Sequence, residues 1–269
     1  MAAKETFYTH GHHESVLRSH RWRTADNSAA YLLPHLQPGM TVLDVGCGPG
    51  TITADLAALI APGRLTAAEV SADALALAQA EAASRGQGNI DFVVSDVHAL
   101  EFPSGAFDVV HAHQVLQHVG DPVQALREMR RVCRPGGILC ARDSDYAAFA
   151  WFPAVPELAE WMALYQRMAR SNGGEPNAGR RLLSWAHGAG LSEVTATSST
   201  WCFATPEDRA WWGGMWAERI LQSDLARQAI TSGAATQADL RRISAGWRTW
   251  AEARNGWFSI LHGEILCRP

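Results

Sequence analysis

Between residues 40 and 145, short apolar runs alternate with segments of helical pattern, and this alternation restricts the fold more than any other feature of the 269-residue chain. The strand-like runs are TVLDV, RLTAAEV, IDFVVS, FDVVHAH and ILCAR, and helical patterns such as TITADLAALI and ADALALAQAEAASR lie between them. Strands that alternate with helices of this length are joined by right-handed crossovers and form a mostly parallel sheet. The sequence therefore predicts an α/β fold, a Rossmann-like sheet with helices on both faces.

The pattern changes after about residue 145. Ten of the eleven tryptophans lie beyond residue 150, and a long polar-helical stretch at about 206–254 separates the strand-like runs EVTATSSTWCFA and WFSILHGEILC. We expect these two runs to complete the sheet and the stretch between them to form a helical cap. Residues 1–36 are expected to form an N-terminal helical lid, and residues 37–269 a single domain.

Composition excludes several classes of protein. The formal charge of −4 argues against a nucleic-acid partner, and no apolar run approaches the ~20 residues that cross a bilayer. The start MAAKETFYTHGHHES lacks the apolar core of a secretion signal. Five cysteines without a CxxC pair predict neither a zinc site nor a disulfide framework. We expect a reduced cytoplasmic protein without membrane or nucleic-acid partners; the sequence indicates no oligomeric state.

Three glycines, Gly46, Gly48 and Gly50, follow the first expected strand in TVLDVGCGPGTIT. Open α/β sheets bind ligands beyond the carboxyl ends of their strands, and glycine lets a backbone approach a ligand closely. A phosphate loop requires GxxxxGK[ST], but no lysine follows here; a dinucleotide turn requires GxGxxG, but the third glycine comes one residue early. Asp44 is an acid, which favours a ligand with a positive or hydrogen-donating group. For this motif taken alone, a tight turn without a ligand is the alternative.

Acidic residues also end the next two strands. Glu69 ends the second strand, where a carboxylate can accept hydrogen bonds from both hydroxyls of a ribose. Asp96 ends the third strand, where it can accept from an adenine amine, and the Val97 backbone can contact the ring. The fourth strand ends at His113, near the expected reacting end. An amine, a ribose and an adenine without a phosphate describe S-adenosyl-L-methionine.

On these residues the chain resembles the class I S-adenosylmethionine-dependent methyltransferases, especially the ubiquinone/menaquinone C-methyltransferases and their small-molecule relatives. The motifs VLDVGCGPG, AAEVS, SDVHALEFPSGAFDVV, HQVLQHVGDP and LREMRRVCRPGGILCARD carry the resemblance over residues 38–145. It implies a seven-stranded sheet with an antiparallel last strand, and S-adenosyl-L-homocysteine as the spent cofactor. The implied cofactor contacts are Asp44, Gly46, Cys47, Gly48, Gly50, Glu69, Val70, Ser71, Asp96, Val97 and His113.

The N-terminal segment folds over the cofactor in many members of this branch, so the resemblance makes Tyr8 and His12 expected lid contacts. Arg23 suits the carboxylate of the cofactor because a guanidinium fork matches a carboxylate; a solvated helix face is the alternative. The histidines at 10, 12 and 13 have no nearby cysteine, and Glu14 is their one acidic neighbour, so we predict no metal site.

A sulfonium cofactor carries its own activation, so the protein mainly has to align the reacting atoms, which is worth roughly 7–11 kcal/mol. An oxygen or carbon nucleophile usually needs a general base, and a neutral amine does not. His113 and His118 are the candidate bases. The alternatives are that His113 lines the cofactor pocket and that His118 braces the loop before Asp121 and Pro122.

Aromatic residues mark the expected acceptor pocket. Those that follow the fifth strand are Tyr146, Phe149, Trp151 and Phe152. Trp212 and Trp216 share one face of a later helix, although core packing is the default for that spacing, and His12 is expected to join from the N-terminus. The sequence predicts methyl transfer to an O, N or C atom of a hydrophobic or aromatic small molecule. The alternatives are an NAD(P)-dependent oxidoreductase and a non-catalytic cofactor-binding protein.

Overall fold

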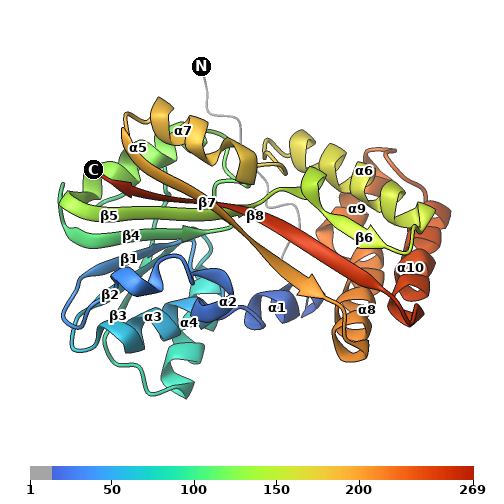
Figure 1. Ribbon diagram of the computed structural model, residues 1–269, viewed down its shortest axis with the longest axis horizontal. Helices are drawn as coiled ribbons and strands as arrows, with labels where there is room; N and C mark the ends of the chain where they lie inside the picture. The colour runs from blue at the N-terminus through green and yellow to red at the C-terminus, as the bar shows by residue number, and fades with distance from the viewer. Residues whose placement is uncertain (1–13) are drawn as a thin grey trace.

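The computed structural model describes residues 14–269, with side chains from residue 17 onward. Its centre is an eight-stranded sheet in the order β3-β2-β1-β4-β5-β8-β6, in which β7 also pairs with β8 (Figure 1). The strands are β1 (Val42–Val45), β2 (Leu65–Glu69), β3 (Ile90–Val94), β4 (Phe107–His113), β5 (Cys133–Ser144), β6 (Ala150–Phe152), β7 (Glu193–Phe203) and β8 (Trp257–Arg268).

Strands β1 to β5 pair in parallel, and β8 runs antiparallel to β5, β6 and β7. Strand β1 is buried along its whole length, as expected for the centre of a sheet that is covered on both faces. The predicted α/β sheet with an antiparallel last strand is confirmed. The short β6, which pairs with the start of β8, is added to the seven expected strands.

Helices cover both faces of the sheet, with α5 and α7 on one side and α2, α3 and α4 on the other (Figure 1). The helices are α1 (Glu14–Arg21), α2 (Ala25–Ser28), α3 (Thr51–Ile60), α4 (Ala72–Ser84), α5 (Pro122–Val132), α6 (Pro156–Ser171), α7 (Leu182–Gly188), α8 (Pro206–Gln222), α9 (Asp224–Thr231) and α10 (Gln237–Glu252). Short 3-10 turns are η1 (Leu33–His35), η2 (Tyr146–Ala148) and η3 (Gly179–Arg181).

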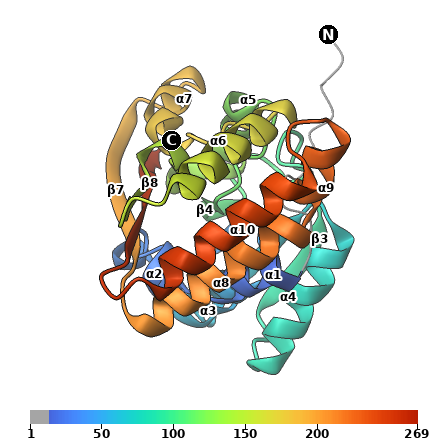
Figure 2. The same cartoon turned by 90° about the vertical axis from the view of Figure 1, so that its right-hand side faces the viewer.

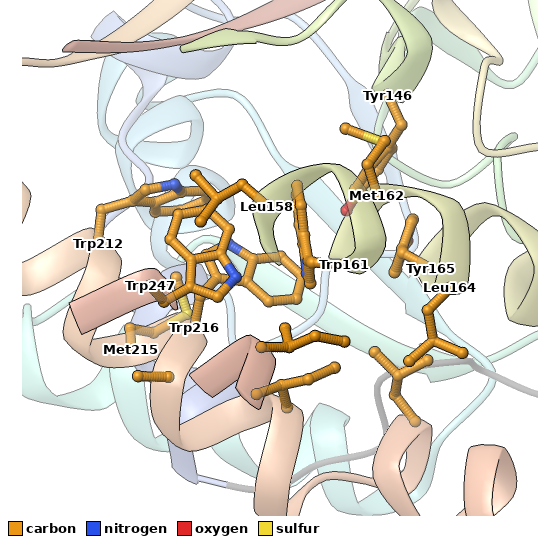
Figure 3. Close-up of a cluster of buried hydrophobic side chains, with 14 of the residues drawn as sticks. Tyr146, Leu158, Trp161, Met162, Leu164, Tyr165, Trp212, Met215, Trp216 and Trp247 are labelled. Carbon is orange, nitrogen blue, oxygen red and sulfur yellow. The ribbon is translucent and has the colours of Figure 1, made fainter. Parts of the chain in front are cut away.

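Helices α6, α8, α9 and α10 form a separate layer beyond one end of the sheet, which we call the cap (Figure 1); Figure 2 shows the same helices from that end. Capping boxes at Thr205 and Thr236 begin α8 and α10, so local sequence fixes where two of these helices start. Between them lies a core of aromatic side chains: the ring of Trp161 is 4.6 Å from that of Trp216 and 4.8 Å from that of Trp247 (Figure 3). Most of the late tryptophans therefore hold the cap together.

The N-terminal helix α1 contacts α8 of the cap, and α2 contacts α3 on one face of the sheet. Arg18 of α1 pairs with Glu218 of α8 at 3.1 Å, and the indole Nε1 of Trp201 donates to the carbonyl of Asn27 at 2.6 Å. The expected lid contacts Tyr8 and His12 lie outside the described residues. None of the helices within residues 14–269 is long and apolar enough to span a membrane.

Candidate cofactor and acceptor site

One cavity of about 490 Å³ opens at the carboxyl ends of the parallel strands. Its walls come from the glycine turn, from the ends of β2, β3 and β4, from α1 and the residues after it, and from the cap. Strand order reverses between β1 and β4, so the cavity lies at the switch point where open α/β sheets bind ligands. Its volume is within the usual range for small-molecule sites.

The three glycines of the turn all adopt left-handed backbone conformations, with φ of +66° at Gly46, +53° at Gly48 and +84° at Gly50. A Cβ at Gly46 would lie 2.4 Å from Cγ2 of Val115, and one at Gly50 would lie 2.8 Å from the backbone of Ala78. A Cβ at Gly48 would meet no atom within 4 Å. Gly46 and Gly50 thus allow tight packing of the turn, whereas Gly48 leaves open volume for a ligand.

Asp44 lies beneath this turn and is 3% exposed. The hydroxyl of Thr53 donates to its Oδ2 at 2.6 Å, and Nδ1 of His111 lies 2.8 Å from its Oδ1. Both carboxylate oxygens therefore tie β1 to α3 and β4, while Asp44 also lines the cavity. The sequence placed His111 near the end of the fourth strand but did not indicate its contact with Asp44, and it did not single out Thr53.

Glu69 stands at the end of β2, as predicted. Its Oε2 accepts a hydrogen bond from the backbone N–H of Gly48 at 3.1 Å, and its Oε1 accepts from the N–H groups of Val70 and Ser71 at 2.9 and 3.2 Å. These bonds hold the carboxylate at the mouth of the cavity beside the 70% exposed side chain of Val70. Cys47 also lines the cavity, and burial raises the pKa of its thiol so that it stays protonated.

Asp96 and Val97 follow β3, and both line the cavity. Oδ1 of Asp96 accepts from the backbone N–H of His98 at 2.9 Å and lies 2.8 Å from His98 Nδ1. Partial burial alone would raise the pKa of Asp96, but the two contacts with His98 hold it below its ordinary value. The sequence did not single out His98, for which the turn-forming order Asp-Val-His was the signal.

Arg23 reaches the cavity from the connection between α1 and α2. Its Nη2 donates to Oε1 of Gln114 at 2.8 Å, and its guanidinium carbon lies 5.6 Å from the centre of the Trp201 ring. Arg23 therefore lies where it could contact a ligand, as expected. It is partly buried and outside a helix, so it does not belong to a solvated helix face.

His113 and His118 both line the cavity. Burial, reinforced by the charge of Arg142, places the pKa of His113 well below its ordinary value, and neither ring nitrogen has a hydrogen-bond partner among the described residues. Burial and the charge of Arg23 lower the pKa of His118 to about 3. Nε2 of His118 lies 3.0 Å from Nε2 of Gln117. Both imidazoles are thus neutral at pH 7, but His113 is almost fully buried whereas His118 is partly exposed.

Aromatic side chains form the far end of the cavity. The lining residues there are Tyr146, Phe149, Trp201, Trp212, Trp216, Arg219 and Ile260. Tyr146 stacks on Phe149 with ring centres 4.5 Å apart, and Trp212 stacks on Phe203 at 4.4 Å. The sequence placed Tyr146, Phe149, Trp212 and Trp216 here, but it gave no sign that Trp201 and Arg219 would join them.

Trp151 and Phe152, which the sequence placed in the acceptor pocket, do not line the cavity. They belong to β6, which pairs with residues 257–259 of β8 and so carries them along the far end of the sheet. Trp151 stacks on Phe258 with ring centres 5.8 Å apart, and Phe152 is 53% exposed. Their position depends on a strand pairing that nearby sequence does not reveal.

Comparisons with known proteins agree with this geometry. A protein family described as a methyltransferase domain matches residues 36–205. An uncharacterized methyltransferase of Schizosaccharomyces pombe is 33% identical over 97% of this chain and 96% of its own length. The ubiquinone/menaquinone biosynthesis C-methyltransferase of Hahella chejuensis is 40% identical, but only over 39% of this chain and 43% of its own.

Among solved structures, a phosphoethanolamine N-methyltransferase of Haemonchus contortus in complex with S-adenosyl-L-methionine shares the fold. Its TM-score is 0.55 at 15% identity, over 98% of this chain and 54% of that one. The match across the sheet and the full-length relative show that the chain belongs to the methyltransferase-domain family and is an S-adenosylmethionine-dependent methyltransferase.

Proposed function

We propose that this enzyme transfers the methyl group of S-adenosylmethionine to an O, N or C atom of an apolar or aromatic small molecule. The observation that carries the proposal is that one continuous cavity joins the acids of the glycine-turn end to the aromatic walls of the cap. A methyl donor at one end and its acceptor at the other would meet inside a single enclosed volume.

The residues at the glycine-turn end suit the cofactor. Gly48 leaves open space, Glu69 offers a carboxylate to ribose hydroxyls, and Asp96 offers its second oxygen to an adenine amine beside Val97. Arg23 carries the charge that would bind the carboxylate of the methionine tail. When bound, the cofactor supplies an electrophilic methyl group on a sulfonium.

The chain's own contribution is placement and exclusion of water. Tyr146, Phe149, Trp212 and Trp216 present rings rather than charges, which favours a planar or apolar acceptor. We propose that the cap and the N-terminal segment together close over this end as a lid.

Of the two candidate bases, His118 fits the role better, because it is the more exposed residue, whereas both ring nitrogens of His113 are buried. A neutral imidazole can accept a proton, but one held at a pKa of about 3 is a weak base. This favours an acceptor that needs little or no deprotonation, such as a neutral amine.

The test combines binding and turnover. Titration calorimetry should show 1:1 binding of S-adenosylmethionine and of S-adenosylhomocysteine. Transfer of a labelled methyl group should then be measured with a panel of acceptors: aromatic and aliphatic amines, phenols and activated carbon acids. Binding of a nicotinamide dinucleotide instead would support the oxidoreductase. Cofactor binding without transfer to any class of acceptor would favour a non-catalytic protein.

A further inference from the structure

Gln114, the residue directly after β4, has a strained backbone. Its φ of 54° makes it the one non-glycine residue within residues 14–269 with a positive φ. Such a conformation is unfavourable for a residue with a side chain and persists where surrounding contacts enforce it. Here its N–H donates to the carbonyl of Arg142 at 2.7 Å, which completes the last pair of the β4–β5 ladder, His113 with Arg142, before the chain turns away.

The side chain of Gln114 is held from two sides. Oε1 accepts from Nη2 of Arg23 at 2.8 Å, and Nε2 lies 2.8 Å from Nε2 of His262. A guanidinium can only donate, so the amide oxygen must face Arg23 and the amide NH₂ must face His262. Nε2 of His262 is therefore an acceptor, which agrees with a pKa that burial and the charge of Arg142 place well below the ordinary value.

These contacts connect three parts of the chain at the cavity wall. Arg23 belongs to the N-terminal segment, His262 to β8, and Gln114 to the loop whose next residue, Val115, packs on Gly46 of the glycine turn. Arg23 and Gln114 both line the cavity. The amide is thus one connection that positions the guanidinium of Arg23 relative to the turn.

We propose that Gln114 is a positioning residue, which fixes Arg23 so that its guanidinium meets the carboxylate of the cofactor's methionine tail. The inference rests on the proposed function, because it needs S-adenosylmethionine in the cavity. The left-handed backbone of Gln114 directs its side chain toward Arg23 and His262. The contact with His262 holds the amide at the cavity wall, where it accepts from Arg23. Without this tie the guanidinium of Arg23 loses one of the contacts that hold it, and ordering it on binding would weaken the affinity for the cofactor.

The experiment compares two ligands. S-Adenosylmethionine carries the carboxylate, and 5′-methylthioadenosine has the same adenine and ribose but no amino acid tail. Gln114→Leu should lower the calorimetric affinity for S-adenosylmethionine about tenfold and leave that for 5′-methylthioadenosine unchanged. Arg23→Met should show the same selective loss, and the double variant should lose no more than Arg23→Met alone. Gln79→Leu, on the exposed side of α4, is the matched control and should bind as the wild type does.

A Gln114→Gly variant separates positioning from folding. Glycine relieves the left-handed strain, so its melting temperature should stay within a few degrees of the wild type while the selective loss of affinity remains. Equal loss for both ligands, full additivity with Arg23→Met, or wild-type affinity in Gln114→Leu would each overturn the inference. Wild-type protein that binds neither ligand would instead overturn the proposed function, and the inference with it.

Discussion

Nδ1 of His111 lies 2.8 Å from Oδ1 of Asp44 in the buried centre of the sheet, and the parallel register of β1 and β4 pairs these same two residues. The acid that first suggested a cationic ligand is therefore also a structural brace, because Thr53 occupies its other oxygen. A carboxylate in this position orders the strand, the helix and the turn that must meet the cofactor.

Replacing Asp44 with alanine should destabilise the fold, because Thr53 and His111 each lose a buried partner at a cost of about 1–3 kcal/mol. Urea unfolding would measure the change in free energy. Asp44→Asn keeps the shape and one acceptor oxygen and should lose less. An Asp44→Ala variant with wild-type stability would show that the brace has no energetic role.

Glycine substitutions should separate packing from ligand space. Gly46→Ala meets both left-handed strain and a clash with Val115, so it should cost more unfolding free energy than Gly48→Ala, by roughly 1–3 kcal/mol. The double variant Gly46→Ala/Val115→Ala should recover part of that difference. In Gly48→Ala the main loss should be in cofactor affinity. Equal unfolding free energies for the two single variants would contradict this division.

Replacing Glu69 with alanine should weaken S-adenosylmethionine binding by roughly 1–3 kcal/mol, because a charged hydrogen-bond partner of the ribose is lost. Calorimetry would measure it, with Glu69→Gln as the control that keeps one acceptor oxygen. The N–H of Gly48 also loses its acceptor, so a small loss of stability should accompany the change. Unchanged affinity would remove the ribose assignment.

Replacing His118 with alanine should leave cofactor affinity intact. With a pKa held at about 3, His118 stays neutral at every pH above about 4, so wild-type kcat should not fall between pH 9 and pH 5 through titration of this ring. If the variant retains turnover, His118 is not the base. A kcat that drops sharply below pH 6.5 and becomes independent of pH in the variant would contradict the depressed pKa.

Stability should fall in acid. His113, His118 and His262 have pKa values below the ordinary 6.5 in the folded state, so below pH 6.5 the unfolded chain binds more protons and the free energy of unfolding decreases. Asp143 acts in the opposite direction: burial raises its pKa to about 7, so its protonation favours the folded state as the pH falls from 7 towards 4. Urea unfolding at pH 7.5, 6.5 and 5.5 would measure the net loss, which should be steeper in Asp143→Asn. A constant free energy of unfolding would contradict the buried neutral histidines.

The local pattern of the chain determined the parallel sheet, the glycine turn and the acids at the strand ends, because each depends on residues close together in sequence. Gly46 follows β1, Glu69 is the last residue of β2 and Asp96 lies two residues after β3, and the carboxyl ends of parallel strands necessarily share one edge. Tertiary structure alone decided the rest. The pairing of β6 with β8 removed Trp151 and Phe152 from the cavity, and contacts across 91 and 148 residues set Gln114 between Arg23 and His262. Such long-range packing has no periodic signal in sequence, because it depends on how finished elements fit together in space.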